Sequence, residues 1–332
     1  MKTNNYFILF SNCIPVKGAR RSTICDLQKG TYVFIPNTLF ALIQDFEKHT
    51  IGEILKKHKG LTKQTLNEYI EYLMSYDLGH YTSCPNNFPK INNKTLSPYK
   101  INDSILELSA HNYKNAEYIF KSLSNLGCQN IELRSYDIFS LSKLSKLLDF
   151  LKSSTIRNVE VYIKYDSSYN EHNYMELCYK HQVVSSILIH SCPEDKSSQN
   201  SEHIFYSTQK IASSSCCGQI SKEHFNVNLK FYLESLNFNT CLNKKISITA
   251  QGNIKNCPSL EKSFGNIKTT SIEDAYKHDD FKSLWNISKD KIEVCRDCEF
   301  RHICSDCRAY LKDSFEKPKT CKYNPYTMSY EV

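Results

Sequence analysis

The sequence predicts an α/β protein in three parts, spread over 332 residues. Three observations support this prediction. Strand patterns precede helical patterns in the first 84 residues, strand and helix patterns alternate over residues 101–235, and seven of the 15 cysteines lie after residue 235. Alternating strands and helices favour a parallel sheet covered by helices, whereas clustered cysteines favour a metal site.

The first part, residues 1–84, predicts a small domain of three strands followed by three helices. Apolar patterns predict strands at Tyr6–Phe10, Arg21–Asp26 and Tyr32–Ile35. Pro36 ends the third strand, and Asn37 can cap the helix that follows. Apolar residues at helical spacing predict two more helices, from Ile51 and from Thr62. This order is typical of a small winged-helix-like unit.

A winged helix can bind DNA, but the third predicted helix, residues 62–76, disfavours that function. It carries Glu68 and Glu71, with Asp77 directly after it, and carboxylates oppose contact with phosphates. The net charge of the chain is only +7, from 42 basic and 35 acidic residues, and no long basic run occurs. We therefore expect no nucleic acid partner.

The second part, residues 101–235, follows a polar, proline- and asparagine-rich stretch at residues 85–100 that predicts a linker. Its predicted strands are Ile105–Leu108, Asn130–Leu133, Val159–Ile163, Ile187–Ile189 and Ile204–Tyr206. The predicted helices between them are Asn115–Leu126, Leu141–Leu151 and Glu171–Gln182. Four or five such units fit this length, whereas an eight-unit barrel typically takes about 250 residues. We therefore expect a partial (β/α) barrel.

No catalytic residue can be assigned in this second part. It has neither of the glycine-rich phosphate-binding loops and no Gly-x-Ser-x-Gly nucleophile turn. Its histidines, at positions 111, 172, 181 and 190, are scattered without metal-ligand or acid–base spacing. The reaction, if there is one, stays unassigned.

The chain shows no signal for a membrane or for secretion. No segment approaches the roughly 20 apolar residues of a membrane helix. The N-terminus lacks the apolar region and cleavage site of a signal peptide. We therefore expect a cytoplasmic protein with no membrane partner. In that reducing compartment cysteines rarely form disulfides, so 15 of them suggest metal.

The cysteines fall into three groups. Six are scattered and predict small buried hydrophobic side chains: Cys13, Cys25, Cys84, Cys128, Cys178 and Cys192. Cys216 and Cys217 form an adjacent pair. The last seven follow the pattern Cys241-x10-Gly252-x4-Cys257, a gap of 37 residues, Cys295-x2-Cys298-x5-Cys304-x2-Cys307, and Cys321. Tetrahedral zinc and iron–sulfur clusters are both candidates, although seven thiols exceed the needs of one zinc ion.

This seven-cysteine pattern resembles the SPASM domain, the C-terminal two-cluster module of peptide-modifying radical enzymes. The family usually has three residues where this chain has only Ser305 and Asp306 before the next cysteine. The resemblance implies that one [4Fe–4S] cluster is held by Cys295, Cys298, Cys304 and Cys321. It implies that a second cluster is held by Cys241, Cys257 and Cys307. The fourth ligand of the second cluster is open, with four candidates: Cys216, Cys217, a substrate group or water.

Relatives of this domain usually carry Cys-x-x-x-Cys-x-x-Cys early in their barrel. Those three thiolates hold the cluster that cleaves S-adenosylmethionine. No such triplet exists among the 15 cysteines. The barrel is therefore expected to have no site for S-adenosylmethionine, and whether the protein is an enzyme stays open.

The first domain resembles the PqqD-like peptide-recognition element of ribosomal peptide biosynthesis. The shared features are the turn Leu27–Gly30, the strand Tyr32–Ile35, the segment Pro36–Thr38 and the short helix after Thr50. The resemblance implies that a leader peptide adds to the third strand and lies against the third helix. The implied peptide-binding residues are Tyr32, Val33, Phe34, Ile35, Leu66, Tyr69, Ile70 and Leu73. The alternative is that these side chains only pack the small domain.

The three parts together resemble the grasp-with-spasm peptide maturases, which are encoded beside an ATP-grasp ligase. The resemblance covers nearly the whole chain, including Ser11–Lys17 and Cys304–Tyr310. It implies a maturation factor for a ribosomally synthesised peptide (RiPP), with a precursor peptide and the ligase as partners. Two alternatives stay open. One is a non-catalytic subunit that recognises the precursor and presents it to the ligase, and the other is a regulatory protein stabilised by zinc.

Overall fold

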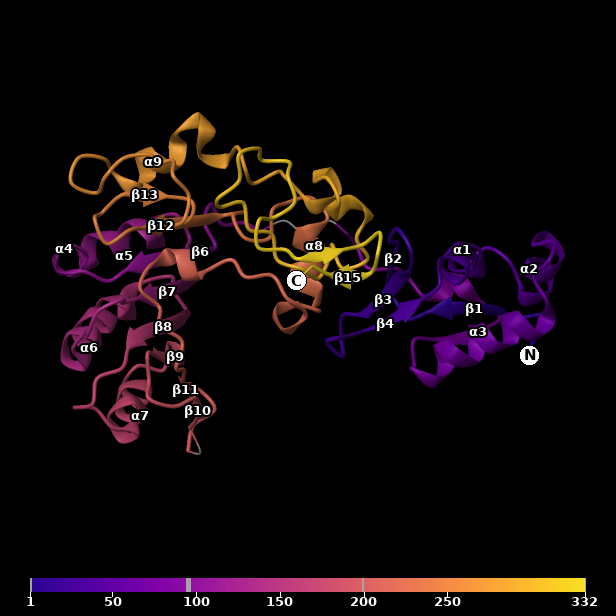
Figure 1. The fold of residues 1–332 in the computed structure, drawn as a ribbon, viewed down its shortest axis with the longest axis horizontal. Coiled ribbons are helices and arrows are strands. Elements are labelled where there is room, and N and C mark those ends of the chain that lie inside the picture. The colour runs from indigo at the N-terminus through magenta and orange to yellow at the C-terminus, as the bar shows by residue number, and fades with distance from the viewer. Residues whose placement is uncertain (1, 94–96, 199, 332) are drawn as a thin grey trace.

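The computed structural model describes residues 2–93, 97–198 and 200–331. The molecule is elongated. A small N-terminal domain lies at one end, a large sheet with its helices at the other, and the C-terminal segment between them (Figure 1). The fold is mixed α/β with a large parallel sheet. Within the described residues, no helix is both long and apolar enough to cross a membrane.

The large sheet has eight strands in the order β10-β11-β9-β8-β7-β6-β12-β13. Its parallel strands are β6 (Asp103–Glu107), β7 (Asn130–Arg134), β8 (Asn158–Lys164), β9 (Val184–His190), β11 (Ile204–Tyr206) and β12 (Lys245–Ile248). Two short strands pair antiparallel at its ends, β10 (Lys196–Ser197) and β13 (Ile254–Lys255). Five of these strands overlap the strands that the sequence predicts.

The two faces of this sheet differ in polarity. Alternate residues along β8 are fully buried, and those between them are half-buried. The buried face packs against α4 (Ala110–Lys114), α5 (Ala116–Asn125), α6 (Leu141–Asp149) and α7 (Glu171–Lys180). On the polar face, a cavity of about 240 Å³ is lined by Glu132, Glu160, Cys241 and Lys245. The cysteine-rich segment therefore lies over the polar face.

The sheet continues across the predicted boundary between residues 235 and 236. Strand β12, which was not predicted, pairs with β6, and β13 extends the sheet further. At the end of β6, Glu107 Oε2 accepts a hydrogen bond from the Ala250 amide at 2.9 Å. Asn112 Nδ2 also joins the carbonyls of Glu107 and Thr249, at 2.7 and 2.8 Å. These bonds hold the start of the cysteine-rich segment on the sheet.

The N-terminal domain contains two small antiparallel sheets. β1 (Tyr6–Leu9) pairs with β5 (Gly79–Thr82), while β2 (Cys13–Val16), β3 (Ser22–Asp26) and β4 (Thr31–Ile35) form the second sheet in that order. The sequence predicts three strands before the helices, and the structure has four. The missed strand, β2, contains Pro15, and it lies at an edge of its sheet, where proline is tolerated.

Three helices complete this domain: α1 (Asn37–Phe46), α2 (Ile51–Lys57) and α3 (Lys63–Ser75). Thr50 and Glu53 form a capping box on α2, and Thr62 caps α3. Asn37 does not cap α1 with its side chain as predicted. Its amide instead donates to the carbonyl of Ala19 at 3.3 Å, so it fixes the loop between β2 and β3.

The predicted linker and the C-terminal third contain little regular structure. Within its described part, the stretch 85–100 has only the short 3₁₀ turn Pro85–Asn87, and residues 94–96 of that prediction lie outside the described residues. The remaining helices and strands are α8 (Leu229–Ser235), α9 (Ile272–Lys277), β14 (Tyr323–Asn324) and β15 (Ser329–Tyr330). Turns dominate after residue 255, so this part has few backbone ladders and depends on side-chain contacts for its stability.

Candidate metal centres

One group of cysteines gathers beside β12. Cys241 lies in the turn before this strand, Cys257 follows β13, and Cys307 comes from a distant loop. The pKa of Cys241 is raised to about 11, mainly by burial; Lys245 opposes this rise, and negative charge on Cys257 and Cys217 adds to it. Burial also raises the pKa of Cys307 to about 11, again with contributions from Cys241 and Cys217. Cys241, Cys257 and Cys307 therefore share one neighbourhood, and the exposed thiol of Cys217 lies within electrostatic range of it.

The buried Asn239 connects two of the loops that carry these thiols. Its Oδ1 accepts hydrogen bonds from the amides of Cys241 and Leu242, at 3.0 and 2.9 Å. Its Nδ2 donates to Asp306 Oδ2 at 2.8 Å, directly before Cys307. One fully buried side chain thus holds the Cys241 turn against the Cys307 loop.

Gly252 makes the turn that returns the chain toward Cys241. Its φ is +85°, a conformation that costs little only for glycine. A Cβ there would also stand 3.1 Å from Ile267 Cγ1 and 3.2 Å from Asn266 Oδ1. The glycine of the seven-cysteine pattern therefore allows the tight β12–β13 connection that precedes Cys257.

A second group lies in the C-terminal loops and contains Cys295, Cys298, Cys304 and Cys321. The pKa of Cys295 is raised to about 11. Burial is the main cause, and negative charge on Cys321 and Cys304 contributes to the rise. Burial raises the pKa of Cys298 too, with a contribution from Cys304. The Cys298 amide donates to the Cys295 carbonyl at 3.0 Å, which closes a tight turn between these two cysteines.

Each group includes one lysine that sequence reasoning missed, the buried Lys289 and the half-buried Lys245. Lys289 Nζ donates to Cys304 Sγ at 3.0 Å, and Lys245 Nζ lies 4.0 Å from Cys241 Sγ. Burial alone would lower the pKa of each lysine, but the neighbouring thiolates raise both pKa values above normal. No sequence signal marks these residues, because lysines are usually exposed. Their charges favour thiolates, which is the form of cysteine that binds metal.

His302 is inside the cysteine pattern but belongs to the packing of the domain. Its Nδ1 lies 3.0 Å from Ser235 Oγ, and its ring packs edge-on against Tyr232. The pKa of His302 is lowered to about 4. Burial is the main cause, and the positive charges of Arg301 and Lys289 contribute. The poor spacing of this histidine for a zinc site agrees with its place in the structure.

The donor chemistry of both groups suits iron–sulfur clusters. Thiolates are the standard protein ligands of such clusters, and both groups consist of buried or half-buried cysteines with no disulfide. Across the described residues, no three His, Cys, Asp or Glu side chains come close enough to hold a single metal ion. The cysteines are grouped here because the charge of one raises the pKa of others in the same group.

The scattered cysteines have varied surroundings. Four of them are buried, namely Cys13, Cys25, Cys128 and Cys192, whereas Cys178 is half-buried and Cys84 is exposed. Burial raises the pKa of Cys13 and of Cys25 to about 12. These thiols stay protonated at neutral pH and serve as packing groups.

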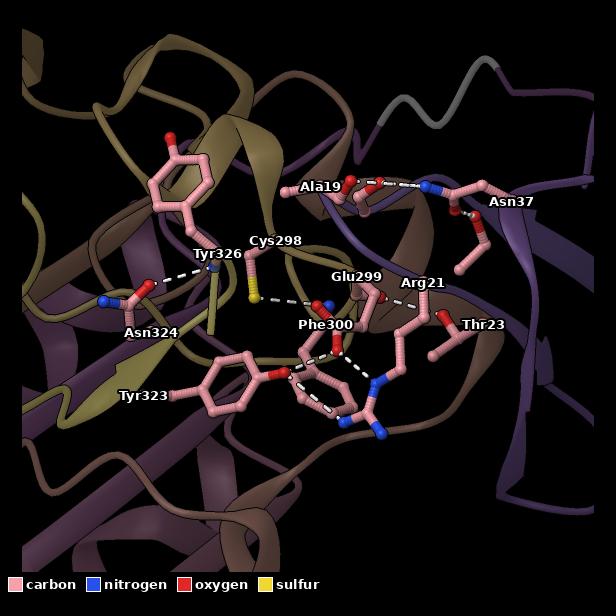
Figure 2. Close-up of polar contacts among 12 residues, drawn as sticks. Ala19, Arg21, Thr23, Asn37, Cys298, Glu299, Phe300, Tyr323, Asn324 and Tyr326 are labelled. Carbon is pink, nitrogen blue, oxygen red and sulfur yellow. Dashed lines mark hydrogen bonds and ion pairs between the residues drawn. The ribbon is translucent and has the colours of Figure 1, made fainter. Parts of the chain in front are cut away.

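The N-terminal domain docks on the loop that carries Cys298. Glu299 is buried in this contact, and Arg21 Nε donates to Glu299 Oε1 at 2.8 Å (Figure 2). Tyr323 donates to the same oxygen at 2.6 Å, and Thr23 donates to the Glu299 carbonyl at 2.8 Å. The hydrogen bond to Glu299 overcomes the effect of desolvation and raises the pKa of Arg21, so the guanidinium stays charged.

Aromatic side chains extend this contact to strand β4. The fully buried ring of Phe300 packs against Tyr32 and Phe34 of β4, with centroids 5.6 and 5.8 Å away. The Phe300 amide also donates to Cys298 Sγ at 3.5 Å. One residue therefore touches both the strand of the N-terminal domain and a cysteine of the second group.

The predicted peptide-binding residues separate into buried and accessible positions. Four of them lie in the core of the N-terminal domain and pack it: Ile35, Leu66, Ile70 and Leu73. Val33 also faces this core. Tyr32 and Phe34 are partly exposed, and the Tyr69 hydroxyl lies 2.9 Å from Thr38 Oγ1 at the surface.

Strand β4 has an outer edge with no strand partner in the described part of the chain. From α3, the Tyr72 hydroxyl donates to the Phe34 carbonyl at 2.9 Å, so this carbonyl faces away from β3. Alternate residues of an antiparallel strand direct their main-chain groups to the same side. Tyr32 and Phe34 therefore present their amides and carbonyls at the open edge, beside α3.

Comparison with known proteins identifies one domain. Residues 240–299 match the SPASM family, described as an iron-sulfur cluster-binding domain. A crystal structure of Streptococcus suis SuiB aligns with 97% of this chain and 99% of its own, at 10% sequence identity and a TM-score of 0.35. No curated protein matches the chain. The chain thus contains a SPASM iron–sulfur cluster-binding domain, which begins directly before Cys241.

Proposed function

We propose that this protein is a RiPP maturation factor that binds a precursor peptide, carries two [4Fe–4S] clusters and works with an ATP-grasp ligase. In this proposal the N-terminal domain is the winged-helix-like, PqqD-like recognition element, and the large sheet is a partial barrel related to radical enzymes. One observation carries the proposal: β4, whose outer edge has no strand partner in the described residues, packs the rings of Tyr32 and Phe34 on Phe300, directly after the SPASM match at residues 240–299. A bound leader would lie next to the iron–sulfur domain.

The leader would bind as an additional strand on β4. The main-chain groups of Tyr32 and Phe34 face this edge, so they offer the hydrogen bonds on which strand addition depends. The adjacent α3 contributes Tyr69 and Tyr72 rather than its buried leucines. Affinity would then come from the backbone, and the exposed tyrosines would contribute to specificity.

The contact between the domains supports a role in presenting the core peptide. Phe300 lies between β4 and Cys298, while Arg21 is fixed to the buried Glu299 of the same loop. A leader held at β4 therefore has a defined place relative to the rest of the protein. This rigid placement is what a recognition subunit needs in order to direct a core peptide to a partner ligase.

Substitutions at Phe34 test the leader site. Phe34→Pro removes the amide hydrogen at the open edge, whereas Phe34→Ala removes the same ring contacts but keeps that amide. We expect Phe34→Pro to bind a synthetic leader peptide, taken from a precursor encoded beside this protein, about tenfold more weakly than Phe34→Ala. The reason is that a main-chain hydrogen bond is lost and that proline is bulkier than alanine at the edge. Fluorescence anisotropy with a labelled leader measures both affinities.

Equal affinities of two folded variants would place the leader elsewhere. Circular dichroism establishes that each variant is folded. Co-expression of the precursor and the ligase, with and without this protein, then tests the larger proposal by mass spectrometry. A product mass that does not depend on this protein would contradict a role in maturation, and stoichiometric zinc without iron would support the regulatory alternative.

A further inference from the structure

We propose that Cys217 is the fourth ligand of the cluster held by Cys241, Cys257 and Cys307. This inference builds on the two-cluster part of the proposed function and supplies a ligand that the seven-cysteine pattern lacks. Four thiolates would then surround each of the two clusters. The following contacts distinguish Cys217 from the adjacent Cys216.

The chain passes directly over Cys307 at the position after Cys217. Gly218 has a φ of +85°, and a Cβ on it would stand 2.7 Å from Cys307 Sγ and 3.3 Å from Cys307 Cβ. No larger residue fits there without a shift of Cys307. This close approach brings Cys217, the immediate neighbour of Gly218, to the first group of cysteines.

Hydrogen bonds fix the segment on both sides of Cys217. The Cys217 amide donates to the Ser214 carbonyl at 3.1 Å, and Ser259 Oγ donates to the same carbonyl at 2.9 Å. Ser259 lies two residues after Cys257, so this bond joins the two cysteine-bearing turns. On the other side, Thr320 Oγ1 donates to the Gly218 carbonyl.

A polar contact sets the direction of the Cys217 side chain. Arg134 Nη2 lies 3.9 Å from Cys217 Sγ, and the same guanidinium pairs with Glu132 of β7. The Cys217 thiol is therefore turned toward the polar face of the large sheet.

Cys216 lies in a different environment. Its thiol is 3.8 Å from the Lys210 carbonyl, on the 3₁₀ turn Ser214–Cys216. A single peptide unit therefore separates a thiol that faces a loop carbonyl from one that faces Arg134. Although both cysteines border a cavity of about 290 Å³, Cys217 is the one directly bonded to Gly218, which lies against Cys307.

A complete set of four thiolates favours a structural role for the first cluster. An iron with three protein ligands would be open to the cavity beside Cys217 and could bind a peptide side chain there. An iron that also binds Cys217 has no position for such a ligand. The inference therefore supports the recognition role over an enzyme with an open-site cluster.

Cys217→Ser tests this assignment, and Cys216→Ser is the matched control. After anaerobic reconstitution, we expect the wild type and Cys216→Ser to hold about eight iron atoms per chain, the content of two [4Fe–4S] clusters. We expect Cys217→Ser to lose iron or to show a changed electron paramagnetic resonance (EPR) signal for one cluster. Iron, labile sulfide and EPR spectra are the measurements.

A second measurement requires no variant that must fold. Isotope-labelled cyanide binds an open iron and produces hyperfine coupling in the EPR spectrum. The wild type should show no coupling if Cys217 closes the site. Coupling in the wild type, or equal iron and equal spectra in the two serine variants, would overturn the assignment.

These outcomes are distinct from a failure of the proposed function. Wild-type protein without iron would overturn the clusters themselves, and with them this inference. Two clusters together with an unchanged Cys217→Ser variant would overturn only the fourth ligand. Leader binding at β4 is measured separately and does not depend on either result.

Discussion

At the scale of single residues, two lysines place positive charge beside the cysteine groups. The buried Lys289 donates to Cys304, and the half-buried Lys245 lies near Cys241, so each group has a neighbouring cation. A cluster with four thiolate ligands is negatively charged, and it gains another negative charge on reduction. A nearby cation therefore favours the reduced state.

Lys289→Met should lower the reduction potential of the second cluster. The substitution keeps a long apolar stem but removes the charge next to Cys304. An EPR-monitored redox titration measures this change. Lys291→Met is the control, because Lys291 is exposed and its ammonium donates to the Asn286 carbonyl. Equal potentials in the two variants would show that Lys289 does not act on the cluster.

At the scale of elements, a side chain of α3 occupies a carbonyl on the open edge of β4, for which an added strand would have to compete. The Tyr72 hydroxyl occupies the Phe34 oxygen that an added strand would use. A leader peptide must therefore replace this hydrogen bond when it binds. The edge strand is protected in the free protein and open to a partner that offers a better set of bonds.

Tyr72→Phe should bind the leader a few-fold more tightly, because the Phe34 carbonyl no longer loses a bond on binding. The same anisotropy assay measures the effect. Tyr76→Phe is the control, since this exposed tyrosine directly follows α3 and its ring centroid lies 4.9 Å from that of Tyr72. Weaker binding by Tyr72→Phe would mean that the hydroxyl contacts the peptide itself.

The strands of the large sheet were largely predictable, because alternation of apolar residues depends on local sequence. Val159 to Ile163 shows it clearly and lies within β8. Strand β12 was missed because its four residues are too few to show an alternation of apolar and polar side chains. Its partner β6 is also distant in the sequence. The cysteine groups were suggested by spacing alone, but Lys245, Lys289 and Arg21 were not. Their roles arise from contacts between distant segments.

At the scale of the whole molecule, a buried carboxylate takes part in the contact between the N-terminal and C-terminal parts. Glu299 accepts from Arg21 and Tyr323 (Figure 2). The centroid of the Phe34 ring lies 3.6 Å from Arg21 Cζ. Removal of one partner from a buried pair leaves an uncompensated charge. The contact should therefore contribute to the stability of the complete protein.

Arg21→Met should destabilise the protein by about 1–3 kcal/mol, less than for a fully buried pair because Arg21 is partly exposed. Thermal denaturation of the iron-loaded protein measures the loss. Arg20→Met removes an adjacent, exposed arginine and should change stability by less than about 0.5 kcal/mol. Similar melting temperatures for the two variants would argue against a stabilising contact at Glu299.

The segment around Gly218 connects both cysteine groups. Two residues after Gly218, Ile220 forms a bridge with Cys321, a cysteine of the second group. Along the chain, moreover, Cys307 of the first group lies between Cys304 and Cys321 of the second. The cysteines of the two groups thus alternate along the C-terminal part of the sequence. Loss of the chain from residue 295 onward would therefore remove Cys307 of the first group together with the whole second group.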